Sequence, residues 1–229
     1  MNTACLRNNL PNSFITKNMV SVEVSVDRWS AWLPGITTDS ALKAWADDQL
    51  AIDLSQTPDI SFLPPNQRRR LSLLSKMVLF TAHTCSDNEK VATVCCSRYG
   101  EFSRTVTLLK CLAAKEPLSP TAFSQSVHNT ALGLFSISNQ NIKPATAIAS
   151  CEDTFPMGFI EAAAMLLSGR QEKVLLVMAD EVPEAPYLAY SEGGIPYAIA
   201  ILLSLKKGKQ GISLLMKPNS ESVANHTHR

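Results

Sequence analysis

Short, uncharged strands alternate with helices through the middle of this 229-residue chain, and this alternation limits the folds it can adopt. Residues 91–96 (VATVCC), 146–150 (TAIAS) and 174–179 (VLLVMA) each indicate a strand without a polar face. The segments between them carry apolar residues at helical spacing. Strands buried on both faces and separated by helices are typical of a parallel sheet covered by helices. The pattern therefore predicts an α/β layered domain with a mostly parallel sheet.

The other periodic segments extend this domain, which we expect over residues 19–217 between a flexible arm at 1–18 and a polar tail at 218–229. A strictly alternating run, VSVEVSV, predicts a first strand over residues 20–26 that ends before Trp29 and Trp32. Helices are predicted over residues 38–51, 67–82, 101–115, 123–137 and 157–168, and two further strands over 197–205 and 211–216. The turn at 206–210 predicts a hairpin between these last strands.

Composition argues against several functional classes. The net charge is only +1, so no overall field favours nucleic acid or an anionic membrane as a partner. The longest apolar runs fall short of the about 20 residues that span a bilayer. Residues 1–18 lack the apolar centre of a secretory signal. We therefore expect a cytoplasmic protein without a membrane span.

Cysteine spacing predicts neither a disulfide framework nor a metal centre. The chain has six cysteines, Cys5, Cys85, Cys95, Cys96, Cys111 and Cys151. None of them forms a CxxC pair, so buried thiols are expected. A zinc site built from His83, Cys85, Cys95 and Cys96 is the alternative, although adjacent ligands lack the usual spacing of structural zinc.

The helix predicted over residues 157–168 is apolar on all sides, and Glu161 is its only charged residue. A helix of this kind must be covered all round. The elements predicted in this chain do not supply a complete second layer. The cover must therefore come from a partner or in part from residues 187–216.

Residues 118–184 resemble the nucleophile region of the β-ketoacyl synthases, the thiolase-fold condensing enzymes of fatty-acid and polyketide assembly. The matching pieces follow in order: Ser119-Pro120, the run Val127-His128-Asn129-Thr130 with Gly133, Pro144 before the strand TAIAS, the Ala-rich helix that ends at Ser168-Gly169, and the strand VLLVMADE. In the synthases a comparable last strand runs into a turn of small residues. Complete synthases contain two similar halves, so the resemblance implies one thiolase-like half, truncated relative to a full enzyme.

A count without gaps from His128-Asn129 to Gly169 puts Glu152 where the synthases have their acyl-accepting cysteine. The free N–H groups at a helix start stabilise a thiolate there, and a carboxylate can accept the same hydrogen bonds. A carboxylate cannot form the thioester from which condensation proceeds. Cys151 would fill this slot only if the register slipped by one residue, which would turn the strand 146–150 to its opposite face. We therefore expect no catalytic residue.

The histidines also differ from those of a complete synthase, whose two catalytic histidines lie in its second half. None of the histidines here, His83, His128, His226 and His228, stands in a similar motif. His128 is expected to orient the helix at 123–137 rather than to transfer protons.

Taken with the run PPNQRRRLSLLSKM, these features are similar to the chain-length factors of aryl-polyene and related type II systems in Gram-negative bacteria. The resemblance implies a non-catalytic subunit that pairs with an active β-ketoacyl-ACP synthase during polyene or fatty-acyl elongation. The two subunits would pair across a two-fold axis through the strand before the nucleophile slot, here Thr146, Ala147, Ile148, Ala149 and Ser150. The phosphopantetheine of an acyl carrier protein would deliver the substrate, and no cofactor of the chain's own is expected.

The same register places Thr121, Ala122 and Phe123 beside the pocket and dimer seam of the condensing enzymes. His128 and Asn129 are expected with them in the tunnel wall or interface. Ala122 and Phe123 are predicted to form the wall of an acyl tunnel, where a bulky residue limits chain length by steric clash. The alternative is that Phe123 is simply a core residue.

Arg68, Arg69 and Arg70 fall in the first turn of the helix predicted over 67–82. Arginine suits bidentate phosphate contacts, so these residues could meet the acidic face or the phosphopantetheine phosphate of a carrier protein. Cations at the positive end of a helix are unfavourable unless an anion faces them. A solvated helix start is the alternative.

Two other functions stay open at this point. A decarboxylase or acyltransferase could use Glu152, Asp153 or Cys151 directly, since paired carboxylates can raise one pKa and supply a general acid. A free-standing acyl-binding scaffold would instead be stable as a monomer.

Overall fold

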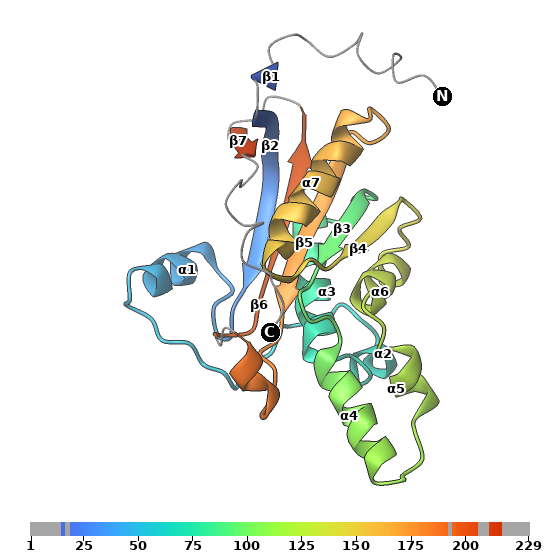
Figure 1. Ribbon diagram of the computed structural model, residues 1–229. Helices are drawn as coiled ribbons and strands as arrows, with labels where there is room; N and C mark the ends of the chain where they lie inside the picture. Colours follow the sequence, from blue (N-terminus) through green and yellow to red (C-terminus); the bar gives the residue numbers. More distant parts are fainter. Residues whose placement is uncertain (1–14, 17–18, 192–193, 206–210, 217–229) are drawn as a thin grey trace, which may run out of the picture.

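One mixed β-sheet with helices on both faces forms the body of the protein, as the computed structural model describes it over residues 15–16, 19–191, 194–205 and 211–216 (Figure 1). The strands are β1 (Ile15–Thr16), β2 (Met19–Trp32), β3 (Ala92–Cys96), β4 (Ala145–Ile148), β5 (Lys173–Asp180), β6 (Tyr197–Ser204) and β7 (Gly211–Met216). Their order is β1-β2-β6-β5-β3-β4, and β7 pairs with β2. The prediction of an α/β layered domain is thus confirmed.

The parallel part of the sheet is limited to three strands. β3 runs parallel to β4 on one side and to β5 on the other. The pairs β5–β6, β6–β2, β2–β7 and β1–β2 are antiparallel. The expected parallel arrangement therefore holds for the centre of the alternating region and not for the strands at the two ends of the chain.

Seven α-helices lie in the described residues: α1 (Asp39–Ala46), α2 (Pro65–Arg68), α3 (Leu73–Ser86), α4 (Phe102–Ala113), α5 (Pro120–Ser124), α6 (Thr130–Ser138) and α7 (Thr154–Leu167). α3 and α6 cover one face of the sheet, and α7 covers the other (Figure 1). Side chains of β5 alternate between the two cores, with Leu175 and Val177 under α3 and with Val174 and Leu176 under α7. This two-residue period explains why β5 reads as continuously apolar.

α7 buries one face, which carries Phe159, Ala162, Ala163 and Leu166. The other face, including Leu167, is left open by the described residues. The predicted need for a second layer over this helix therefore persists in the folded chain.

Two predicted helices are each divided. The segment 67–82 forms α2 and then α3, because the Ser72 hydroxyl accepts a hydrogen bond from the Ser75 amide at 3.0 Å and starts a new helix. The segment 123–137 forms α5, which starts three residues earlier at Pro120 after its cap Ser119, and then α6. The prediction of one continuous helix was wrong in both places, since apolar spacing carries across a short break between two helices.

The antiparallel strands also differ from expectation. β2 continues to Trp32 because residues from Ser25 onward pair with β6, so the strand does not end at residue 26. β6 and β7 pair with successive parts of β2 and not with each other, so the predicted hairpin is wrong. The turn proposed at residues 206–210 lies outside the described residues, as do most of the arm and the tail.

Candidate functional site

A cavity of about 350 Å³ lies where the carboxyl ends of β3 and β5 meet the start of α7. Cys151 and Glu152 line it together with the carboxylates of Asp180 and Glu181. The remaining wall is formed by Arg98, Tyr99, Thr154, Phe155, Met178, Val182, Pro183, Ile195 and Tyr197. The segment predicted to hold the nucleophile slot therefore does face a cavity, and we refer to it as the Glu152 cavity.

A tight turn presents Cys151 and Glu152 to this cavity. Cys151 has a left-handed backbone with φ of 48° and opens a 3-10 turn, Cys151–Asp153, directly before α7. The buried Thr154 hydroxyl donates to the Cys151 carbonyl at 2.7 Å and accepts from the Ser150 amide at 2.9 Å. Both the Cys151 and Glu152 side chains are exposed. No side chain caps the start of α7, so its free N–H groups favour an anion nearby.

Asp180 is a buried carboxylate that the sequence analysis did not single out. It accepts hydrogen bonds from the Ser97 hydroxyl at 2.7 Å, the Arg98 amide at 3.1 Å and the Tyr99 amide at 3.2 Å. Burial raises its pKa, and these hydrogen bonds oppose the rise. A polar residue at the carboxyl end of an apolar strand was the available signal, because the carboxyl ends of neighbouring parallel strands share one edge of the sheet.

Glu181 separates the Glu152 cavity from a second cavity of about 520 Å³, and with Val182 it lines both. Its carboxylate accepts from the Leu74 amide and from the Ser103 hydroxyl, the latter at 2.6 Å. Burial raises the pKa of Glu181. The Glu181 side chain thereby joins the first turns of α3 and α4 to the end of β5.

The residues predicted to form a tunnel wall are divided between two environments. Ala122 lines the second cavity, whereas Thr121 is exposed. Phe123 is 65% exposed, so the alternative that it is simply a core residue is wrong. Asn129 is exposed and precedes α6 without capping it through its side chain.

The two described histidines both make structural contacts. His128 lies between α5 and α6, and its Nε2 is 2.8 Å from the Ser97 carbonyl oxygen. His83 stacks on Phe62 with ring centroids 3.9 Å apart, and burial lowers its pKa. Neither lines the Glu152 cavity. His226 and His228 lie outside the described residues.

The strand predicted to meet a partner lies at the end of the sheet. Within the described residues β4 pairs only with β3, so its other edge is open. Thr146, Ala147 and Ile148 belong to β4, whereas Ala149 and Ser150 follow it. Exposed apolar side chains occur on or next to α5, α6, α7 and β4, namely Phe123, Val127, Ile137, Ile142 and Met157.

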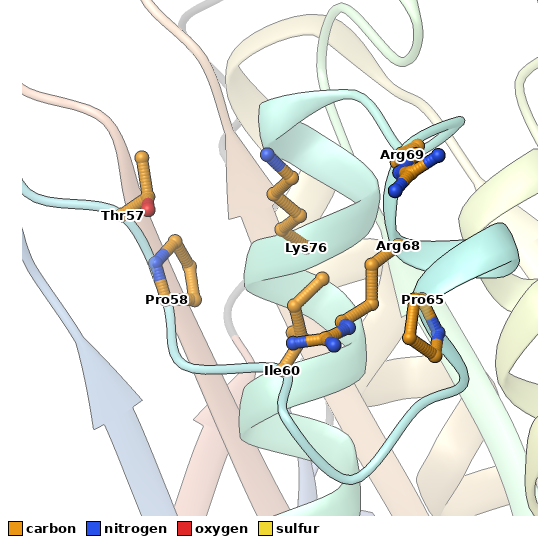
Figure 2. Close-up of a pocket in the computed structure, with 7 residues that line it drawn as sticks. All are labelled: Thr57, Pro58, Ile60, Pro65, Arg68, Arg69 and Lys76. Carbon is orange, nitrogen blue, oxygen red and sulfur yellow. The ribbon is translucent and has the colours of Figure 1, made fainter.

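A third cavity, of about 330 Å³, contains two of the three predicted arginines (Figure 2). Arg68 and Arg69 line it with Lys76 of α3, beside Thr57, Pro58, Ile60 and Pro65. Arg70 does not line it, and its carbonyl oxygen accepts from Arg104 Nη2 at 3.0 Å. We refer to this site as the cationic cavity.

The arginines do not stand in the first turn of α3, so that prediction was wrong. Arg68 ends α2, where the negative end of the helix dipole favours a cation, and α3 begins only at Leu73. Arg68 Nε is nevertheless buried without a hydrogen-bond partner in the described part of the chain. Sequence reasoning missed Lys76, because only the folded structure shows that it lines the same cavity as Arg68.

The cysteines of the alternative zinc site face different environments. Cys95 packs in the core under α3 and Cys96 in the core under α7, on opposite faces of β3. Burial raises the pKa of each thiol to about 12, so both stay protonated. Across the residues with described positions, no three His, Cys, Asp or Glu side chains gather as a metal site. None of the helices in those ranges combines the length and apolar character that crossing a membrane requires.

Several solved structures have a fold similar to that of this chain. One solved structure, described as "Ketosynthase (ApeO) in Complex with its Chain Length Factor (ApeC) from Xenorhabdus doucetiae", is 29% identical with a TM-score of 0.72, and the match covers 82% of this chain and 81% of that one. The ishigamide ketosynthase/chain length factor is 16% identical with a TM-score of 0.64, covering 80% of this chain and 62% of the other. A type II acyl carrier protein in complex with its ketosynthase, AntDE:AntF, is 14% identical with a TM-score of 0.62, at coverages of 80% and 62%.

The family comparison extends the similarity over most of the sequence. No curated protein matches the chain. Residues 42–229 match the model of the β-ketoacyl synthase N-terminal domain. The chain therefore belongs to the β-ketoacyl synthase N-terminal domain family.

Proposed function

We propose that this chain is a chain-length-factor subunit that pairs with a catalytic β-ketoacyl synthase through the open edge of β4. The observation that carries the proposal is this edge, bordered by exposed apolar side chains on the neighbouring helices. An open strand edge offers unpaired N–H and C=O groups to another strand. The similarity to a ketosynthase bound to its chain length factor supports a synthase as the occupant.

The apolar side chains make the edge suitable for a stable interface. Ile142 is 98% exposed three residues before β4, and Ile137 is exposed on α6, which contacts β4. Exposed apolar patches of this kind mark interaction sites on soluble proteins. A partner sheet that continues from β4 would bury them and would add cover beside α7.

Glu152 supports a role without condensation chemistry. Glu152 lines a cavity at the start of α7, where free N–H groups can hold an anion. A glutamate in the nucleophile slot cannot carry an acyl thioester. The partner would then supply the cysteine and the proton-transfer groups, while this chain supplies structure.

Ala122 would contribute the wall that limits product length. It lines the largest of the three cavities described above, and its methyl group leaves room that a larger side chain would fill. Phe123 is the next residue and is exposed, so a bound partner can cover it. The growing chain would stop where it meets these side chains.

The cationic cavity would contact the carrier protein. The side chains of Arg68, Arg69 and Lys76 make no hydrogen bond or ion pair within the described residues, and no carboxylate lines the cavity. Cationic side chains without acidic neighbours favour an anionic ligand, such as an acidic side chain or a phosphodiester. In this proposal Lys76 takes the place first expected for Arg70.

An enzymatic alternative rests on the same cavity, since Cys151 and Glu152 both line it. One experiment separates the two functions: co-expression with a full-length, cysteine-bearing synthase, followed by sizing of the complex and a malonyl-thioester turnover assay of each component. A stable complex with turnover only in the pair supports the subunit. Turnover of malonyl thioester by the purified chain alone favours the enzyme, and a stable monomer that binds no synthase overturns the pairing.

A further inference from the structure

Ser97 connects three segments at the carboxyl end of β3. Its hydroxyl donates to Asp180 Oδ1 at 2.7 Å and accepts from the Gly100 amide at 2.7 Å. Its carbonyl oxygen lies 2.8 Å from His128 Nε2. A carbonyl can only accept, so His128 Nε2 carries the proton in this contact. Ser97 is buried, so losing one of these partners would leave a polar group without a hydrogen bond and would cost more free energy than at an exposed site.

The Asp180 end of this connection is part of the Glu152 cavity. Asp180 lines that cavity and also holds the Arg98 and Tyr99 amides through its carboxylate. Hydrogen bonds from two consecutive amides and a hydroxyl leave the side chain little freedom. The turn at residues 97–100 is therefore held to the end of β5.

The His128 end of the connection lies in the link between α5 and α6. The imidazole packs on Gly100, where an added Cβ atom would be 2.8 Å from His128 Cδ2. Gly100 also has φ of +56°, a conformation that favours glycine. Ring packing and hydrogen bond together hold His128 against the same turn.

α5 has little other anchorage. None of its residues is buried, and the one helix that it contacts substantially in the described structure is α4. Ala122 and Phe123 precede His128 by only six and five residues. The position of these side chains therefore depends on how firmly His128 is held.

We propose that Ser97 is a positioning residue that ties the Glu152 cavity to α5 through Asp180 and His128. This connection keeps Ala122 and Phe123 at a fixed position relative to the Glu152 cavity. The consequence for product length rests on the proposed function, whereas the physical coupling does not.

Hydrogen exchange on the full chain tests the coupling directly. His128→Phe keeps a ring against Gly100 and removes the N–H donor, whereas His128→Gln keeps a donor and removes the ring. Amides in residues 120–129 should exchange about tenfold faster in His128→Phe, as expected for a lost hydrogen bond, and at near wild-type rates in His128→Gln. Ser97→Ala keeps the carbonyl that accepts from His128 but removes the hydroxyl contacts to Asp180 and the Gly100 amide, so the turn at 97–100 should loosen and exchange in residues 120–129 should rise by a smaller factor. Equal exchange in wild type and His128→Phe would overturn the proposal.

Product length from the reconstituted synthase pair tests the consequence. Ser97→Ala and His128→Phe should each broaden the distribution of lengths, and the double variant should add little, because both act through one connection. His128→Gln should retain the wild-type distribution. Faster exchange with unchanged lengths would confirm the coupling and refute the wall, while additive effects of the two variants would refute a shared connection.

Discussion

Gly158 on α7 lies so close to Cys96 on β3 that a Cβ atom at residue 158 would be 2.0 Å from Cys96 Sγ. Replacing a helical glycine by alanine normally stabilises a helix by about 1 kcal/mol. At this position we expect Gly158→Ala to lower the free energy of unfolding by about 1 to 3 kcal/mol, because the added methyl group overpacks the core. Urea denaturation measures the change.

Gly133 on α6 is the matched control, since an added Cβ atom there would meet no atom within 4 Å. Gly133→Ala should raise the free energy of unfolding by up to about 1 kcal/mol. Cys96→Ala combined with Gly158→Ala should recover part of the loss, because it removes the sulfur. If Gly158→Ala is as stable as Gly133→Ala, α7 does not pack on β3 at this distance.

The open edge of β4 predicts that a charge beside it weakens the synthase complex. Ile142→Lys should raise the Kd about tenfold or more, since the ammonium group would lose its hydration in an apolar interface. Leu54→Lys is the control, because Leu54 is also an exposed apolar residue, at 68%, but lies far from β4 in the chain and outside the elements that contact it. Equal affinities for the two variants, measured by interferometry with the purified synthase, would rule out this interface.

Because Ala122 lines the second cavity, a larger side chain at this position is expected to change product length. Ala122→Trp should shorten the products of the reconstituted pair, because extending into filled space costs about 1 to 3 kcal/mol. Ala46→Trp, at an exposed position on α1, should leave the lengths unchanged. Mass spectrometry of the released chains is the measurement, and products of wild-type length from Ala122→Trp would argue against a wall at this residue.

The cationic cavity predicts selective effects of charge reversal on carrier-protein binding. Arg68→Glu and Lys76→Glu should each weaken binding by at least about 1 kcal/mol, roughly fivefold in Kd, and the loss should shrink at high salt. Arg70→Glu makes the same change in charge outside the cavity and should have a smaller effect. Titrations with fluorescently labelled carrier protein compare the three variants. An equal loss of affinity in Arg70→Glu would show that binding does not depend on the cationic cavity.

Glu181 predicts a pH dependence of stability. Burial raises its pKa in the folded chain above the ordinary value of 4.5, so the folded state binds this proton more tightly than the unfolded state does. The stability of the wild type relative to Glu181→Gln should therefore be greatest below pH 4.5 and should fall as the pH rises through the raised pKa. A stability difference that stays constant from acid to neutral pH would show that this carboxyl is not perturbed.

Local patterns predicted the centre of the fold well. The uncharged runs at β3, β4 and β5 and the apolar spacing of α4 and α7 placed these elements within a few residues of their observed bounds. Each depends on the period of side chains along one element, which the sequence displays directly. The alignment with the synthase family placed the nucleophile slot at residues 151–152, and in the structure these residues line a cavity.

Other features depended on contacts between distant segments. The Ser72 cap divided one predicted helix, and pairing with β6 carried β2 through Trp32, although neither boundary follows from apolar spacing. Lys76 of α3 and Arg68 of α2 line one cavity, which follows from the arrangement of the two helices and not from their spacing in the sequence. Phe123 is apolar and yet exposed, so its residue type alone could not decide its environment.

Local side-chain periods in the sequence are enough to place β3, β4, β5, α4 and α7 and to mark their apolar faces, because side chains repeat every two residues along a strand and about every 3.6 residues along a helix. Glu152 before α7 stands out through the family resemblance. The hydrogen bonds that join Ser97 to Asp180 and to His128, 83 and 31 residues away along the chain, depend on how the folded chain brings these segments together. Such contacts arise where the carboxyl ends of parallel strands meet at one edge of the sheet. Spacing along a sequence carries no information about which of these ends become neighbours.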